Sequence, residues 1–306
     1  MSKEKVTVIG LTGQSAFFRT EQLPKPGETV ACKDLFFEAG GKGHNQAVAC
    51  ARMGIETILI SAVGKDENGR ACRDALKQEG VKTCLIEKDI STAFATVTTA
   101  KDGENVVEVF SGAAGNMSGG DLLQPCILRA LQDCSYLLLQ NELPVECLET
   151  AITLAEQKEV KVILNPAPAR NLPLEFLSRC YAITPNAGEA KILAGITGND
   201  PITDEEWKIF VQNNGIKNLI ITMGANGVLI VNDRICKKIE AYSAGQVVDT
   251  TGAGDVFNGV MTAALASGEG LERAVIAAVT AAGISVTRKG VAVSIPQKEE
   301  VIGLMI

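Results

Sequence analysis

The 306-residue chain has a single histidine, His44, and no C-x-x-C pair among its nine cysteines. A His-based triad or a His-rich metal site therefore has at most one candidate, and a zinc site is disfavoured. Scattered cysteines in odd number are typical of reduced, mostly buried thiols in a cytoplasmic protein, so we expect that location. His44 enters a helix from a glycine-rich loop, and we expect a surface or helix-cap role for it.

The sequence also lacks long apolar runs and positive charge. No stretch approaches the roughly 18 uninterrupted apolar residues of a membrane span, and the N-terminus has no signal-peptide h-region. The net charge of −7 argues against binding to nucleic acid or to an anionic membrane. An anionic substrate would therefore have to be held by local donors.

The two best-known glycine-rich phosphate motifs are missing. Gly40-Gly41-Lys42-Gly43 does not fit G-x-x-x-x-G-K-[ST], and no G-x-G-x-x-G follows the first apolar strand at residues 6–9. The chain therefore has neither a P-loop nor a dinucleotide-binding fingerprint, and the missing fingerprint disfavours an NAD-dependent dehydrogenase.

Apolar strand patterns alternate with helical patterns along the chain. Helical spacing at residues 67–78 and 145–157 lies between strand-like runs such as 57–63 and 160–164. This alternation predicts an α/β fold, a doubly wound and mainly parallel sheet with helices on both faces. No linker divides the chain, so we expect one domain over residues 1–306.

Two excursions from this alternation, at about residues 12–38 and 90–112, predict a small separate β-sheet. Residues 92–99 and 106–110 flank a turn with Asp102-Gly103, a strong hairpin signal, and residues 29–37, which begin with strand formers, can join this hairpin in one sheet. A small sheet beside an α/β domain is suited to act as a lid that closes the site against water.

A stretch near the C-terminus combines three signals. The apolar pair Val247-Val248 is expected to end a strand, the turn Gly252-Ala253-Gly254 follows, and a helical pattern runs over 256–266. Glycines at a helix start let backbone N–H groups converge on an anion. Asp255 in this turn either caps the helix or serves as a general base for a hydroxyl nucleophile.

Polar residues follow several expected strands, where parallel sheets bind ligands. Each could be an ordinary helix cap, but together they offer a base and oxygen ligands for hydrated Mg²⁺. They are Glu142, Asn165, Asn186, Glu189, Asp249 and Asp255.

Two motifs resemble the signatures of the ribokinase-like (PfkB) carbohydrate kinases. One is Gly40-Gly41-Lys42-Gly43-His44-Asn45-Gln46-Ala47, and the other is Asp249-Thr250-Thr251-Gly252-Ala253-Gly254-Asp255. Further similarity at residues 165–170, 184–189 and 286–290 extends the resemblance over nearly the whole chain.

The resemblance implies an ATP-dependent sugar kinase that uses Mg²⁺ and a monovalent cation such as K⁺. It assigns catalysis to Asp255 as general base, with Gly252, Ala253 and Gly254 as the anion hole. The implied acceptor-binding residues are Gly41, Lys42, Asn45, Glu142 and Ser15. The implied nucleotide-binding residues are Asn186, Thr222, Gly224 and Gly227. Glu189 would hold Mg²⁺ through water, and the monovalent-cation residues would be Asp249, Thr251, Ser285, Arg288, Gly290 and Ser294.

One departure from the family pattern concerns the acceptor. The family usually carries Asn-x-Asp after the first strand, and this chain has Gly13-Gln14-Ser15. Ser15 cannot replace a carboxylate that grips two hydroxyls, so the sugar is open. Gln14 or Arg19 are candidates for a different hydroxyl pattern.

Several alternatives therefore remain beside the sugar-kinase interpretation. They are a nucleoside, sugar-acid or sugar-phosphate kinase of the same family, and a non-catalytic sugar-binding or regulatory protein. In all of them the partner is a small molecule. Because the expected lid exposes strand edges that need covering, we also expect a homodimer formed through it.

Overall fold

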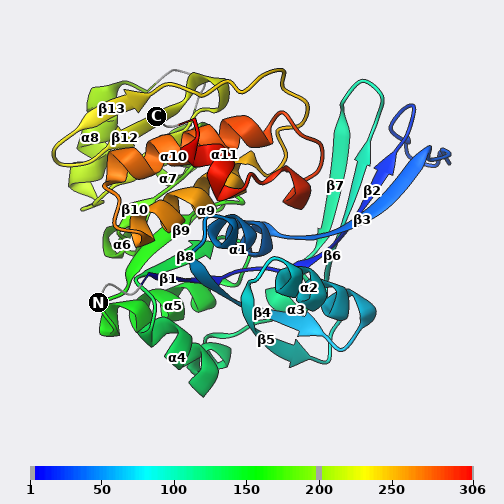
Figure 1. The fold of residues 1–306 in the computed structure, drawn as a ribbon, viewed down its shortest axis with the longest axis horizontal. Helices are drawn as coiled ribbons and strands as arrows, with labels where there is room; N and C mark the ends of the chain where they lie inside the picture. Colours follow the sequence, from blue (N-terminus) through cyan, green and yellow to red (C-terminus); the bar gives the residue numbers. More distant parts are fainter. Residues whose placement is uncertain (1–3, 198–201, 305–306) are drawn as a thin grey trace.

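The computed structural model describes residues 4–197 and 202–304 and contains two β-sheets (Figure 1). The larger sheet has nine strands in the order β13-β12-β11-β10-β9-β8-β1-β4-β5. Its strands run parallel to one another from β11 to β5. At the other edge, β12 runs antiparallel to both of its neighbours, β11 and β13. The bounds are β1 Lys5–Ile9, β4 Glu56–Gly64, β5 Lys82–Lys88, β8 Tyr136–Gln140, β9 Lys161–Asn165, β10 Ala182–Ile183, β11 Leu219–Thr222, β12 Val228–Val231 and β13 Cys236–Ile239.

Helices cover both faces of the larger sheet, because its central strands are buried on both sides. Side chains from one face pack with α3 Gly112–Gly115, η1 Gly119–Leu123, α4 Pro125–Gln132, α5 Val145–Gln157, α6 Leu174–Arg179, α7 Ala187–Leu193 and α8 Asp204–Asn213. Those from the other face pack with α1 Lys42–Arg52, α2 Glu67–Gln78, α9 Ala253–Ala266, α10 Leu271–Ser285 and α11 Lys298–Ile302. Two further 3₁₀ turns are η2 Gly224–Asn226 and η3 Ala292–Ser294.

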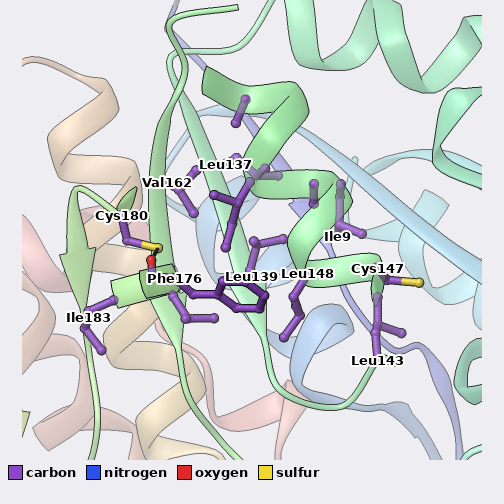
Figure 2. Packing of buried hydrophobic residues seen from close by; sticks show 14 of the residues in the cluster. Ile9, Leu137, Leu139, Leu143, Cys147, Leu148, Val162, Phe176, Cys180 and Ile183 are labelled. Carbon is purple, nitrogen blue, oxygen red and sulfur yellow. Dashed lines mark hydrogen bonds between the residues drawn. The ribbon is translucent and has the colours of Figure 1, made fainter. Parts of the chain in front are cut away.

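Figure 2 shows the first of these two cores. Leu137 and Leu139, alternate residues of β8, pack there with Leu148 of α5 and Phe176 of α6, and all four are at most 2% exposed. Leu138 between them lies in the opposite core. Before Gln140 at its end, this strand is therefore an unbroken apolar run, as expected for a parallel strand with helices on both faces.

The smaller sheet stands off one side of the larger one (Figure 1) and is called the lid below. Its order is β3-β2-β6-β7, with bounds β2 Gly13–Arg19, β3 Asp34–Gly40, β6 Ala93–Thr99 and β7 Asn105–Phe110. The β6–β7 hairpin is confirmed. The contribution of residues 29–37 to this sheet is confirmed only from Asp34, where β3 begins, because residues 29–33 are mostly exposed and form no strand.

Two other sequence expectations are wrong. Val247 and Val248 are 60% and 49% exposed and form no strand; the N–H of Val248 donates to the carbonyl of Val286, at the end of α10. The cysteines are not all reduced, because Cys84 of β5 and Cys126 of α4 form a disulfide between segments 42 residues apart. The other seven are outside any disulfide, and five of them are buried as expected.

Trp207 is buried on α8 against the larger sheet. In the part of the chain that the structure describes, no helix is long and apolar enough to cross a bilayer.

Candidate active site

Asp255 lies in the first turn of α9 and is only 6% exposed. Its two carboxylate oxygens accept hydrogen bonds from α1: Asn45 Nδ2 donates to Oδ2 and Gln46 Nε2 donates to Oδ1, both at 2.9 Å. A buried carboxylate is costly unless its oxygens are hydrogen-bonded. These two amides satisfy the carboxylate without neutralising its charge, so it remains able to accept a proton.

The two helices can approach this closely because of Gly259. A Cβ at this position would lie 2.4 Å from Ala49 Cβ and 2.6 Å from the carbonyl oxygen of Gln46. Any side chain at residue 259 would push α9 away from α1. The contact between Asp255 and the two amides therefore depends on a glycine one turn further along α9.

An amide network behind Asp255 fixes the position of Gln46. Gln46 Nε2 also donates to Asn165 Oδ1 at 3.1 Å, and Gln46 Oε1 accepts from Gln140 Nε2 at 2.7 Å. Sequence reasoning assigned no role to Gln46 or Gln140. The available signal was a glutamine within an alanine-rich helix and another at the end of an apolar strand, both 0% exposed.

Three of the residues expected to bind the acceptor surround Asp255. The backbone N–H of Lys42 donates to Glu142 Oε2 at 2.9 Å, which joins α1 to the loop after β8. The charge of Asp255 is the largest cause that raises the pKa of Lys42, followed among the raising causes by Glu142 and Glu189. One ammonium group thus lies among three carboxylates.

The other two expected acceptor residues lie at the mouth of the same site. Gly41 has φ 100° and packs on Leu11, where a Cβ would come within 2.6 Å. Ser15 points to the same side of the lid as Gly40: an ideal Cβ on Gly40 would lie 4.0 Å from Ser15 Oγ and 3.6 Å from Asn45 Oδ1.

Asn45 Oδ1 is a buried acceptor with no hydrogen-bond partner among the described residues. Its neighbour Nδ2 donates to Asp255. A buried, unpaired acceptor costs free energy, and a ligand hydroxyl would satisfy it. This side chain therefore points to a hydroxyl-bearing ligand next to Asp255.

The residues of the glycine turn are arranged as a helix N-terminus. Gly252 caps α9 in the left-handed region, with φ 78°. The first-turn N–H groups of a helix have no acceptor within it, which makes this end suited to an anion. Of the three expected donors, Ala253 is engaged in the turn itself, where its N–H lies 3.3 Å from the carbonyl oxygen of Thr250.

The expected nucleotide-binding residues lie at the carboxyl ends of β10 and β11. Asn186 forms an isolated parallel bridge with Thr222, and Thr222 N–H donates to the carbonyl of Pro185 at 2.9 Å. Gly224 has φ 56° in the loop that follows β11. Gly227 is required to be a glycine by packing alone, since a Cβ there would lie 2.0 Å from the carbonyl oxygen of Ile239.

Glu189, the expected Mg²⁺ residue, belongs to a capping box. Its Oε2 accepts from Asn186 N–H at 2.8 Å, and Asn186 Oδ1 accepts from Glu189 N–H at 2.9 Å. Among the described residues no three acidic, histidine or cysteine side chains form a metal cage. A single carboxylate still fits Mg²⁺, which keeps several waters and binds through substrate phosphates.

The expected monovalent-cation residues are only partly brought together. Asp249 accepts from the N–H groups of Thr251 at 2.9 Å and Gly290 at 3.4 Å, so these three residues adjoin. The hydroxyls of Ser285 and Ser294 donate to the carbonyls of Ala282 and Val291, at 2.8 Å each. The side chain of Arg288 forms an ion pair with Glu300 on α11.

The position of the His44 side chain corrects one expectation, while a contribution of Gln14 or Arg19 to acceptor binding stays a prediction. His44 has neither a surface nor a cap role: it is 1% exposed, its Nδ1 lies 2.9 Å from Thr12 Oγ1, and burial lowers its pKa to about 4. Alternation along β2 places Gln14 on the opposite face from Ser15. Arg19 lies roughly 13 Å further along the strand, with its guanidinium over Phe36.

Comparison with known proteins agrees with this geometry. The pfkB family carbohydrate kinases match residues 3–298, and the chain belongs to this family. It is therefore an ATP-dependent carbohydrate kinase with a ribokinase-like fold.

Several relatives match over nearly their full length. The chain is 36% identical over 302 residues to ribokinase from Haemophilus influenzae, covering 98% of each chain. Ribokinase from Thermotoga maritima superposes with a TM-score of 0.88 at 32% identity, again covering 98% of each. The structure of Arabidopsis thaliana ribokinase complexed with ribose and ATP gives a TM-score of 0.88 at 27% identity, with 98% of both chains covered.

The electrostatics of the acceptor site lead to a stability prediction. Burial raises the pKa of Glu142 from 4.5 to about 7 against the opposing charge of Lys42, and Asp255 adds to the rise. Between these pH values the folded state binds more protons than the unfolded state. The contribution of Glu142 to the free energy of unfolding should therefore fall by on the order of 2 kcal/mol from pH 4.5 to pH 7, whereas buried His44, whose pKa is lowered, contributes in the opposite direction.

Glu142→Gln should remove this part of the pH dependence, as measured by urea unfolding at several values between pH 4.5 and 8. Glu146→Gln, on the exposed side of α5, is the matched control and should behave as the unmodified chain. Equal pH profiles for all three proteins would contradict the assignment of the titration to Glu142.

Proposed function

We propose that this kinase transfers the γ-phosphoryl group of ATP to a hydroxyl of a small sugar, with Asp255 as the general base. The observation that supports this most directly is the pairing of Asp255 with Asn45, whose Oδ1 is left to accept from a ligand hydroxyl. A carboxylate, an unpaired acceptor and a helix N-terminus then lie at one place.

The transfer follows from these positions. The acceptor hydroxyl, hydrogen-bonded to Asp255, attacks the γ-phosphorus in line; the O–P bond to it forms as the bond to the β-phosphate oxygen breaks. Asp255 takes the hydroxyl proton, and ADP leaves. The first-turn N–H groups of α9 and the ammonium of Lys42 stabilise the charge on the phosphoryl oxygens. Mg²⁺, held through water by Glu189, would neutralise the nucleotide phosphates.

We propose that Asn186, Thr222, Gly224 and Gly227 contact the nucleotide. Asp249, Thr251 and Gly290, which adjoin in the structure, would take part in a monovalent-cation site for K⁺. Asp249 and Thr251 lie directly before the glycine turn in sequence, so a bound cation there would order the anion-binding turn.

The catalytic assignment predicts the effect of Asp255→Asn. This variant keeps the shape of the side chain but removes the base, so kcat should fall by on the order of 10² or more while ATP binding persists. Turnover by coupled ADP release and ATP binding by calorimetry test this. Asp74→Asn, on the exposed face of α2, is the control. Near-normal kcat in Asp255→Asn would refute its role as base.

The acceptor is identified by ADP release with ATP, Mg²⁺ and K⁺ across ribose, deoxyribose, hexoses, sugar acids, sugar phosphates and nucleosides. We expect one neutral sugar to stimulate ADP release at least tenfold, since exposed hydroxyls match Asn45 and Ser15. Stimulation only by a nucleoside, acid or phosphate would select that alternative. Sugar binding without stimulated turnover would support the non-catalytic alternative.

We also propose that the lid forms a homodimer contact. Exposed apolar side chains gather on its strands: Phe37 is 59% and Val109 is 64% exposed, and every residue of β7 is exposed. Unpaired strand edges with apolar side chains favour association.

Phe37→Asp should shift sedimentation from a dimer towards the 32.2 kDa monomer. Ile209→Asp, at a 48% exposed position on α8 away from the lid, should leave it unchanged. A monomeric unmodified chain at micromolar concentration would overturn this proposal.

A further inference from the structure

Glu38 on β3 connects the lid to the segment that precedes α11. Its carboxylate is half-buried and accepts the backbone N–H groups of Val291 at 3.3 Å and Ala292 at 2.6 Å. Ala292 begins the 3₁₀ turn η3. Hydrogen bonds from two adjacent N–H groups to one carboxylate are charge-assisted and fix its direction.

The segment that Glu38 contacts is held from the other side by α1. Arg52 Nη1 donates to the carbonyls of Ala292 at 2.9 Å and Ile295 at 2.5 Å, and Arg52 is itself paired with Glu79. Arg52 is at the C-terminal end of the helix that begins at Lys42. The segment is thus fixed to α1, which packs on the larger sheet, and Glu38 joins the lid to this segment.

The same segment contacts the glycine turn of α9. An ideal Cβ on Gly252 would lie 2.5 Å from Val291 Cγ1, so the Val291 side chain packs directly on this turn. Asp249, three residues before Gly252, accepts a hydrogen bond from the N–H group of Gly290. One residue, Val291, therefore touches Gly252 with its side chain and Glu38 with its N–H group.

Glu38 is also close to the acceptor end of the site. In the register of the lid it pairs with Ser15, so the two side chains share a face of the sheet. Two residues further on, β3 ends at Gly40, and the chain enters α1 through Gly41. A displacement of Glu38 would therefore move both Ser15 and the start of α1.

We propose that Glu38 is a positioning residue that joins the lid to the anion-binding turn: it holds the lid over the acceptor and holds Val291 against Gly252. This rests on the proposed function for the turn and the acceptor site. The carboxylate acts within the protein, on backbone N–H groups. The chain thus keeps a carboxylate opposite Ser15, but uses it to close the site rather than to bind the sugar.

The test compares Glu38→Ala and Glu38→Gln with Glu108→Gln, a lid control whose exposed carboxylate accepts a hydrogen bond from Thr96 on the neighbouring strand β6. We measure amide hydrogen exchange over residues 288–296, and KM and kcat for the acceptor identified above. In Glu38→Ala the amides of Val291 and Ala292 should exchange about tenfold faster, and KM for the acceptor should rise about tenfold. Glu38→Gln should show smaller changes of the same kind, and the control none.

Val291→Ala separates the two parts of the proposal, because it keeps the N–H group and removes the packing on Gly252. We expect a severalfold lower kcat with KM nearly unchanged, and a less-than-additive effect on kcat when it is combined with Glu38→Ala. Additive effects on kcat would show that Glu38 does not act through Val291.

Amide hydrogen exchange can be measured without an acceptor and without turnover. It therefore distinguishes a failure of this proposal from a failure of the kinase assignment. Unchanged exchange at residues 288–296 in Glu38→Ala would overturn the contact. Faster exchange with unaltered KM and kcat would overturn its role in positioning.

Discussion

The burial of one negative charge constrains the rest of the site. Asp255 is enclosed between two helices, and both of its carboxylate oxygens accept hydrogen bonds from neutral amides, while its charge acts on nearby Lys42. Neutral donors lower the cost of burial yet leave the carboxylate able to take a proton. The arrangement demands that α1 and α9 meet almost backbone to backbone, and Gly259 and Ala49 permit this. Segments 210 residues apart in sequence are thereby tied together.

Much of the fold could be predicted from local patterns. The alternation of strands and helices gave the parallel sheet, and the bounds of α2 and α5 match the predicted helices at 67–78 and 145–157. Strand β2 was not recognised, since Gly13–Arg19 lacks a simple alternation and is held by neighbours in the lid on both sides. The exposed pair Val247-Val248 shows the opposite error, in which strand-forming residues have no strand to pair with.

The candidate site could be predicted as far as motifs define it. Asp255, Asn45, Lys42 and Glu142 do lie together, whereas the partners that orient them come from distant segments. Gln140 reaches Gln46 across 94 residues and Glu38 reaches Ala292 across 254, and no spacing in a sequence shows such pairs. His44 was misjudged for the same reason, because its partner Thr12 lies in another element. The nucleotide and cation residues and the cellular location stay predictions.

The order of the functional residues along the chain has a consequence for how such enzymes diversify. Apart from Asp255, the candidate acceptor-binding residues and the lid lie before residue 143, whereas the candidate nucleotide-binding residues and the glycine turn follow residue 185. Substitutions or recombination confined to the first half could therefore replace one acceptor with another and leave phosphoryl transfer intact. Gly13 and Ser15, which stand where the family pattern has Asn-x-Asp, lie in this first half. Such exchanges must respect the contacts that join the two halves, namely the crossing of α1 with α9 and the hydrogen bonds of Glu38 and Arg52 with residues 291–295.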